Sequence, residues 1–118
     1  MLTGHVTHAF EELLGRFRLL ARSGLGRYLA VNWVLFCIPV VLFFFVLNDK
    51  RWAYKLSLAY AGFMGLQGMG HVVGTVATGR NFGGFAGGYS GIGLLAISLP
   101  LIYVLWKEMP AAPGRISP

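Results

Sequence analysis

Three long apolar runs limit what this chain can fold into. They cover about residues 28–47, 56–78 and 85–106, and each is close to the roughly 20 apolar residues that a helix needs to cross the hydrocarbon core of a membrane. The segments between the runs are short, so neighbouring helices must run antiparallel. The runs predict an all-α fold: an integral membrane helical bundle with three clear transmembrane helices, a C-terminal tail over 107–118 and a single membrane domain over 1–118.

The composition agrees with a membrane location. Hydrophobic residues make up 56% of the chain and charged residues 12%, whereas about 25% charged is usual for a soluble domain. The mean hydropathy is +0.65. The net charge is +6, but all 10 Lys and Arg residues lie at or near the ends of expected helices, where they can meet phospholipid headgroups. We therefore expect membrane lipids as partners, and no nucleic acid.

Residues 3–22 predict a shorter N-terminal helix. Charged residues such as Glu12, Arg16 and Arg18 leave no run that is long enough to span a membrane alone. The helix therefore either dips into the membrane beside the other three or lies in the interface as an amphipathic helix. A cleaved signal peptide is not expected, because the charges follow the apolar part and no cleavage site of small residues ends it.

The N-terminal helix concentrates the polar chemistry of the chain. At about 100° per residue, His5, His8, Glu11 and Glu12 fall within an arc of about 120°. His8 and Glu12 have the i, i+4 spacing at which one helix can grip a single cation with two side chains. A simpler alternative makes Thr7 the cap of the helix and places the two glutamates near its first turn, where the helix dipole favours anions.

A second group of polar residues is expected at the same depth. Gln67 and His71 are one helical turn apart on the second run, and His71 lies about 10 Å from the end of that run. Asn32 lies just inside the first run, and Tyr89 and Ser90 lie just inside the last, on the same side of the membrane. Because ionisable groups in a bilayer face the bundle interior, we expect these residues to gather with the N-terminal stripe.

Half-buried carboxylates and imidazoles must be neutralised by protonation, by an arginine or by a bound metal. Nitrogen and oxygen ligands without a thiolate suit Zn, Mn or non-haem Fe. The sequence leaves open a metal site and a metal-free hydrogen-bonded site. The candidate metal ligands are His8, Glu12, His71, Glu11 and His5. The candidate catalytic residues are Glu11, Glu12, His8 and His71, and the candidate cofactor-binding residues are Gln67, Asn32 and Tyr89.

The chain also contains 17 glycines, many of them on the last two runs. Small residues let membrane helices approach closely, and several glycines have the G-x-x-x-G spacing. These pairs are Gly70 with Gly74, Gly84 with Gly88, and Gly87 with Gly91. They predict tight packing between the last two helices or against a second copy. A nucleotide site is not expected, because the glycine-rich segment follows no strand and lacks the lysine of a P-loop.

The segment HAFEE, from His8 to Glu12, is an H-x-x-E-E motif. Its position near the N-terminus of a small chain with several apolar runs resembles the HXXEE-motif family of bacterial membrane proteins. That family also shows an N-x-x-x-H motif in its third helix, and QGMGH is similar, with Gln67 in the asparagine position and His71 matching the histidine.

A third element of the family, aromatic-x-Pro-Gly, has its nearest counterpart in FAGG, where Gly87 takes the place of the proline. The resemblance implies four helices with the acidic motif on the first, which is short at its front in this chain. It also implies a location in the bacterial cytoplasmic membrane. It implies no particular reaction.

Two classes of function are open. In the first, the protein is a small membrane enzyme in which Glu11 or Glu12 is a general base or metal ligand, and a lipid or isoprenoid-like substrate enters from the bilayer. Desolvation is then expected to raise the carboxylate pKa toward neutrality. In the second, it is a homo-oligomer or a non-catalytic accessory or scaffolding subunit of a larger respiratory or photosynthetic complex. Such a subunit would contact partner helices through its glycine and aromatic faces.

Overall fold

The structure, a computed structural model, describes residues 2–14, 24–82 and 87–110. The described residues form helices and contain no strand, which confirms the all-α prediction. The helices are α1 (Leu2–Leu14), α3 (Leu25–Val46), α4 (Arg51–Ala77) and α5 (Gly88–Lys107). Gly84 and Phe85, which belong to an expected glycine pair and to the third family motif, lie outside the described residues.

Local sequence explains where the helices end and begin. After α3 the chain turns through Asp49, which has a φ of 52°, a left-handed conformation that Asp tolerates better than most residues. The N–H of Lys50 closes this turn by donating to the carbonyl oxygen of Phe45 at 3.1 Å. Before α5 the chain turns at Gly87, which has a φ of 81° and needs no side chain there. Short turns of this kind hold successive helices antiparallel.

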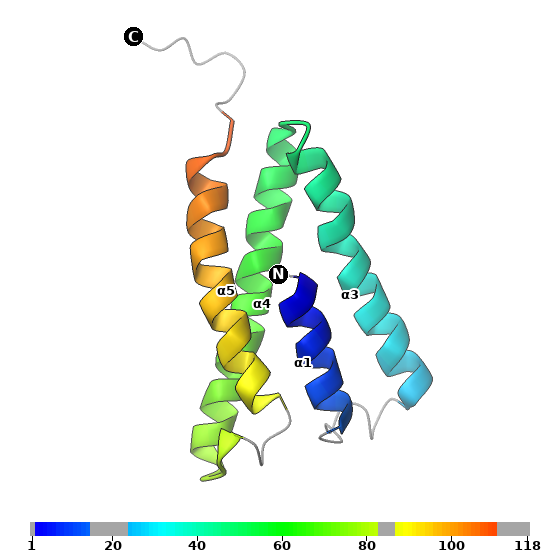
Figure 1. The fold of residues 1–118 in the computed structure, drawn as a ribbon, viewed down its shortest axis with the longest axis vertical. Coiled ribbons are helices and arrows are strands. Elements are labelled where there is room, and N and C mark those ends of the chain that lie inside the picture. The colour runs from blue at the N-terminus through cyan, green and yellow to red at the C-terminus, as the bar shows by residue number, and fades with distance from the viewer. Residues whose placement is uncertain (1, 15–23, 83–86, 111–118) are drawn as a thin grey trace.

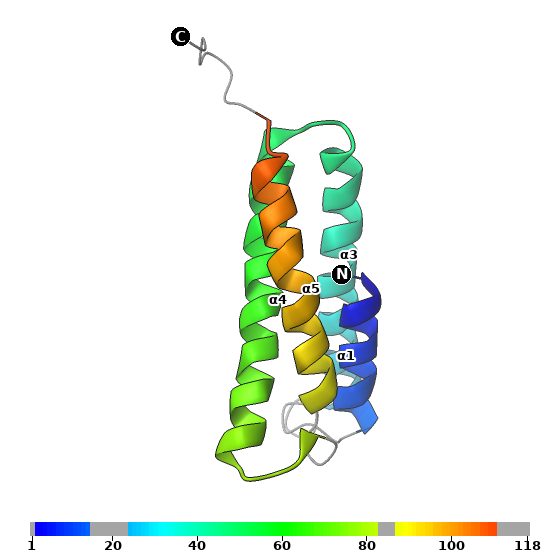
Figure 2. The same cartoon turned by 60° about the vertical axis from the view of Figure 1, so that its left-hand side comes forward.

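Three helices run the length of the bundle, and α1 covers only part of it. α3 and α4 form a hairpin, and α5 returns beside α4 (Figure 1). α1 packs against α5 and α3, and its first residue lies near mid-height in both views (Figures 1 and 2). Its 13 residues reach about 20 Å, against about 40 Å for the 27 residues of α4. Residues 15–22 of the expected N-terminal helix lie outside the described residues.

The α4 and α5 backbones approach closely at two glycines, Gly68 and Gly91. A Cβ atom on Gly68 would lie 2.6 Å from the carbonyl oxygen of Gly91, and one on Gly91 would lie 2.8 Å from Cβ of His71. Gly70 does not take part in this contact, because a Cβ there would meet nothing within 4 Å. Of the two alternatives predicted for it, packing between the last two helices is wrong, and packing against a second copy stays a prediction. Two residues after Gly68, Gly70 has turned about 200° around α4 and faces away from α5.

Two helices, α3 and α5, are long and apolar enough to cross a membrane. The most apolar window of α3 has a mean hydropathy of 2.6, and that of α5 has 1.8. α4 does not meet the same criterion, so two of the three expected spans are supported by composition. The mean hydropathy of α4 is low because its glycines, Gln67 and His71 stand where a typical span has larger apolar residues.

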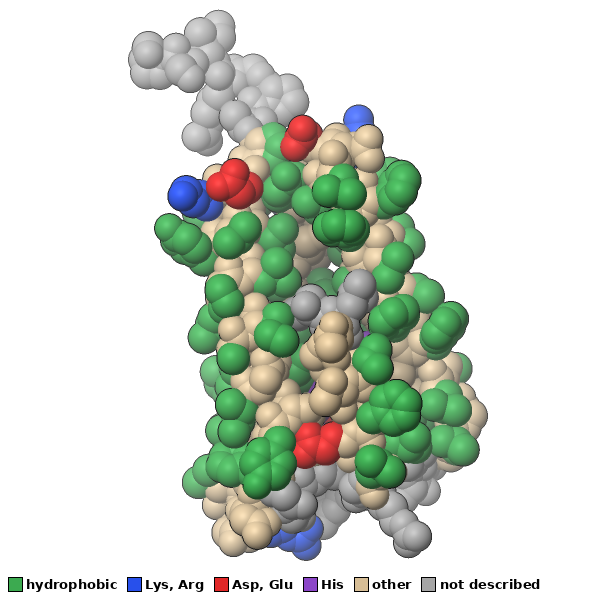
Figure 3. Space-filling model, viewed as in Figure 1, with side chains coloured by type: hydrophobic (Ala, Val, Ile, Leu, Met, Phe, Trp, Pro, Cys, Tyr) green, Lys and Arg blue, Asp and Glu red, His purple; other side chains and the backbone are tan. Residues whose placement is uncertain are grey.

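The outer surface of the bundle is largely apolar. On the face shown in Figure 3, hydrophobic side chains follow the length of the helices, and charged side chains gather toward the two ends. Exposed side chains include Trp33, Phe43 and Phe44 of α3 and Leu66 of α4. The described interior, by contrast, contains several histidine, glutamate, serine and threonine side chains. Polar side chains thus share the interior with apolar ones, while large apolar side chains cover much of the outside.

Candidate functional site

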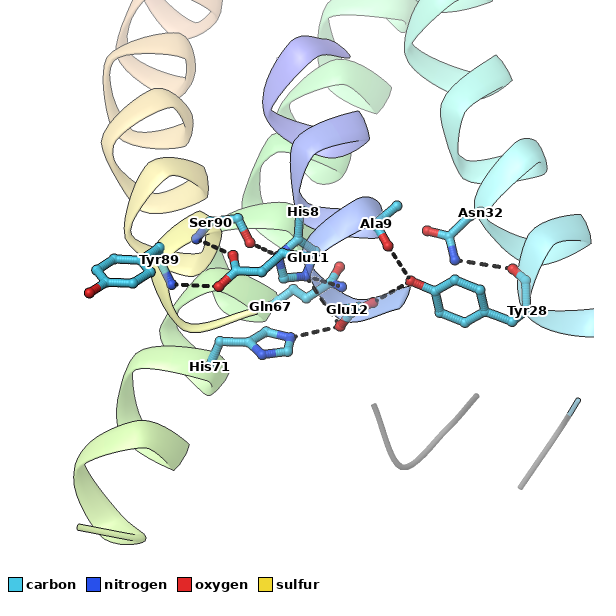
Figure 4. A network of polar contacts seen from close by, with 10 residues as sticks. All are labelled: His8, Ala9, Glu11, Glu12, Tyr28, Asn32, Gln67, His71, Tyr89 and Ser90. Atoms are coloured by element: carbon cyan, nitrogen blue, oxygen red, sulfur yellow. Dashed lines mark hydrogen bonds and ion pairs between the residues drawn. The ribbon is translucent and has the colours of Figure 1, made fainter. Parts of the chain in front are cut away.

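α1 turns its polar stripe toward the other helices. His5, His8 and Glu12 are buried, with exposed fractions of 3%, 1% and 4%. The polar side chains of α4 and α5 lie against this stripe, as the argument from depth predicts (Figure 4). The stripe and its neighbours form a polar network inside an otherwise apolar bundle.

Three of the expected metal ligands come together. Oε1 of Glu12 lies 3.3 Å from Nε2 of His8 and 3.0 Å from Nε2 of His71. The two imidazole rings meet edge to face, with centroids 4.5 Å apart, and the three ligand atoms all lie within 4.8 Å of one another. A tetrahedral zinc with ligands at about 2.0–2.1 Å holds them about 3.3 Å apart. The buried residues His8, Glu12 and His71, hereafter the His/Glu cluster, can therefore hold a metal ion.

Gln67 and Ser90 hold the imidazole of His8 from both sides. Nε2 of Gln67 lies 3.0 Å from Nε2 of His8, and Oγ of Ser90 lies 2.7 Å from Nδ1 of His8. Nε2 of His8 therefore lies within reach of both Gln67 and Glu12, and the tautomer of the ring decides which of its two nitrogens donates.

Glu12 is ionised in this setting. Burial raises its pKa, but its interactions with the imidazoles of His71 and His8 lower it further, and the resulting pKa is about 2. The sequence-based expectation of a carboxylate with a pKa raised toward neutrality is therefore wrong for Glu12. A carboxylate with so low a pKa is a weak base near pH 7, and it attracts a cation.

Glu11 lies outside the His/Glu cluster. Its Oε1 accepts a hydrogen bond from the N–H of Tyr89 at 3.1 Å, and its Oε2 accepts one from the N–H of Ser90 at 2.7 Å. The first N–H groups of a helix have no acceptor within the helix, so Glu11 caps α5 from α1. It positions α5, and the structure does not place it as a metal ligand. Thr7 lies within α1, so the alternative in which it caps that helix is wrong.

The remaining expected site residues surround the cluster without joining it. Nε2 of His5 lies 3.4 Å from the backbone oxygen of Asn32. The side chain of Asn32 donates to the carbonyl of Tyr28 at 3.1 Å. Tyr89 contributes its backbone N–H to the network, while its side chain is exposed. His5 and Asn32 therefore belong to the contact between α1 and α3.

Two further residues complete the site and were not expected there as functional residues. The hydroxyl of Tyr28 lies 3.0 Å from Oε2 of Glu12 and 3.0 Å from the carbonyl of Ala9, so it can donate to either. Gly87 leaves room for the imidazoles, because a Cβ there would lie 2.6 Å from Nδ1 of His71. The available signal for Tyr28 was its place one helical turn before Asn32, at the polar end of the first apolar run.

The chain matches no family model, no curated protein and no solved structure. The features that bear on its function are the buried His/Glu cluster and the side chains from α3, α4 and α5 that hold it.

Proposed function

We propose that the chain is a small integral membrane protein. The observation that carries this is α3, whose most apolar window has a mean hydropathy of 2.6 although only 6% of it is buried. The core helix of a soluble protein would be covered by other elements, whereas α3 exposes Trp33, Phe43 and Phe44. An apolar surface of this extent is stable against lipid or another apolar surface, and not against water.

α4 is the third span in this proposal. Its 27 residues reach about 40 Å, more than the roughly 30 Å of a hydrocarbon core. The residues that lower its hydropathy include Gly68, His71 and Thr75, which are buried inside the bundle, while Leu66 and Val73 face outward. A membrane bundle is expected to place its polar residues inside and its apolar residues outside.

The second part of the proposal is that the His/Glu cluster binds one divalent metal ion. Nε2 of His8 lies 3.3 Å from Oε1 of Glu12, whose pKa is held low. A cation held by these two atoms would be attracted by the carboxylate charge and would accept the lone pair of the imidazole nitrogen. His71, with its Nε2 3.0 Å from the same oxygen, supplies the third ligand. These three residues also carry the resemblance to the HXXEE-motif family, to which we propose the chain belongs.

The donor set favours Zn, Mn or Fe. It consists of two imidazole nitrogens and one carboxylate oxygen, and the single cysteine, Cys37, is exposed on α3 and takes no part. Three protein ligands leave at least one coordination position for a further ligand, as in zinc sites that carry out chemistry. The buried Oε1 of Gln67 has no hydrogen-bond partner within the described part of the chain, and the same amide contacts His8, so Gln67 offers a further oxygen donor beside the cluster.

Metal analysis of the protein purified in detergent, after removal of any affinity tag, tests this proposal. We expect about one metal ion per chain in the wild-type protein, and only traces in Glu12→Gln and His71→Ala, because a two-ligand site binds metal far more weakly. His5→Gln is the matched control, since it changes a buried histidine on the same face of α1 that lies outside the cluster. A full metal complement in His71→Ala, or none in the wild type, would contradict the proposal.

Ser90 gives a second test. Its Oγ lies 2.7 Å from Nδ1 of His8, so it would accept the ring proton from Nδ1 when Nε2 holds the metal. Loss of such a partner typically weakens metal binding about 10- to 100-fold, and we expect this of Ser90→Ala in a competition titration with a chromophoric chelator. Ser98→Ala is the control on the same helix, because Ser98 is buried and its hydroxyl has no partner within the described residues. Equal affinities in the two variants would show that Ser90 does not orient His8.

A specific observation also supports the alternative of an accessory subunit or homo-oligomer. Three glycines lie on the outward faces of α4 and α5: Gly62, Gly70 and Gly93. A Cβ on any of them would meet nothing within 4 Å. Small residues that the chain does not use for its own packing leave room for close approach by another helix. In this alternative, the outer glycine and aromatic faces contact a partner, and the metal stabilises the subunit.

A further inference from the structure

Two pairs of polar side chains meet at the centre of the site, one pair from each of two helices. His8 and Glu12 lie one helical turn apart on α1, and Gln67 and His71 lie one turn apart on α4, so each pair shares one face of its helix. Figure 4 shows the two pairs turned toward each other. Three of the four residues form the His/Glu cluster, and the fourth is Gln67.

The amide of Gln67 is as close to the cluster as the members of the cluster are to one another. Nε2 of Gln67 lies 3.0 Å from Nε2 of His8. Oε1 of Glu12 lies 3.3 Å from the same atom of His8 and 3.0 Å from Nε2 of His71. The ligand atoms of a tetrahedral zinc are about 3.3 Å apart. The end of the Gln67 side chain therefore has the distance from His8 that a fourth ligand atom would have.

The present orientation of this amide would not suit a bound metal. Oε1 of Gln67 is buried without a hydrogen-bond partner in the part of the chain that the structure describes, which is costly for an acceptor. A metal would take the lone pair of Nε2 of His8, so the amide nitrogen would have nothing to donate to at that atom. A half-turn about the Cγ–Cδ bond exchanges the amide oxygen and nitrogen. It brings Oε1 to the metal and leaves the rest of the side chain in place.

We propose that Gln67 is the fourth ligand of a zinc ion and binds it through Oε1 after this half-turn. The proposal rests on the proposed metal site and decides what type of site it is. Two imidazole nitrogens and two oxygens complete a tetrahedral shell, so the ion has no open position for a substrate, as in structural zinc sites. The zinc then fastens α1 to α4 with two ligands from each helix.

The infrared spectrum of the protein tests the role of Gln67. Gln67 is the only glutamine in the chain, so labelling glutamine with carbon-13 at Cδ isolates the C=O stretching band of this one side chain. We expect zinc to move this band to lower wavenumber in the full-length protein in detergent, because coordination through the oxygen weakens the C=O bond. The shift should be the same in H₂O and in D₂O. His71→Ala is the control, in which zinc should leave the band unmoved.

Two infrared results would overturn the role of Gln67 and leave the metal site itself intact. The first is an unmoved band in wild-type protein that holds zinc. The second is a zinc-induced shift that differs between H₂O and D₂O, because it would mark a hydrogen bond from a water molecule on the metal. Absence of zinc from the wild-type protein would instead contradict the metal site.

Two variants separate a ligand from a residue that only orients His8. Loss of an orienting residue weakens metal binding about 10- to 100-fold, as expected of Ser90→Ala. Gln67→Met keeps the length of the side chain without its oxygen, and we expect its zinc affinity to fall further than that of Ser90→Ala. Gln67→Glu keeps an oxygen and should bind zinc at least as tightly as the wild type. A loss in Gln67→Met no larger than in Ser90→Ala would overturn the proposal. If Gln67→Met fails to fold, the infrared measurement on the wild-type protein still decides.

Discussion

Removal of the metal with a chelator is expected to lower the melting temperature of the protein in detergent. The proposed ion bridges Glu12 of α1 and His71 of α4, two residues that only the folded chain brings together. At a free metal concentration about 100 times the dissociation constant, binding to the folded state alone contributes about 2.7 kcal/mol of stability. Thermal unfolding of the protein with and without EDTA, followed by circular dichroism, measures the loss.

Two variants decide whether this loss comes from the His/Glu cluster. Glu12→Gln keeps the size of the side chain and removes its charge, so EDTA should no longer change the melting temperature. His5→Gln should remain as sensitive to EDTA as the wild-type protein, because His5 lies outside the cluster. A wild-type protein that melts at the same temperature in EDTA as in excess zinc, manganese and iron would contradict a stabilising metal.

The second large effect is expected at the contact between α4 and α5. Gly68→Ala should destabilise the protein by about 1–3 kcal/mol, the usual cost of overpacking. The added Cβ would lie 2.6 Å from the carbonyl oxygen of Gly91 and 3.0 Å from Cβ of Leu94, and the backbone of α5 can yield only if the helices separate. The higher helix propensity of alanine opposes this loss by about 1 kcal/mol, which leaves a net loss of up to about 2 kcal/mol. Thermal unfolding in detergent provides the measurement.

Gly70→Ala is the matched control, with the same substitution two residues further along α4. A Cβ there meets nothing within 4 Å, so only the gain in helix propensity should remain, and stability should stay equal or rise by up to about 1 kcal/mol. If both variants lose stability to the same extent, the close approach at Gly68 is not what holds α4 to α5. A loss confined to Gly70→Ala, together with a smaller oligomer, would support a subunit contact at the outer face.

The sequence predicts those features that depend on distances along one helix. The apolar runs predict three of the helices, because their length and composition are local properties. The spacing of His8 and Glu12 predicts that they share a face, and the count of residues from the end of α4 predicts that His71 lies at their depth. These local rules therefore predict the central members of the candidate site.

Features that depend on how each helix is rotated about its axis are not predicted. Gly68 and Gly70 look equivalent in the sequence, and only the packing of α4 on α5 shows that one is in contact and the other is not. The role of Glu11 likewise depends on where α5 begins relative to α1. The alternative that makes Thr7 a cap is wrong because α1 already begins at Leu2, a start that carries no clear sequence signal.

The short length of α1 has a consequence for the order in which the molecule is made. The ribosome delivers α1 first, yet Gln67 and Ser90, which hold His8, follow it by 59 and 82 residues. The 13 described residues of α1 reach about 20 Å. Under the proposed location this part of the chain does not by itself cross the membrane, and as an amphipathic helix it is stable at the membrane surface. It can dock only after α4 and α5 have inserted. A chain halted before α5 would hold two of its hydrophobic helices in the membrane and still lack the pocket for the imidazole of His8.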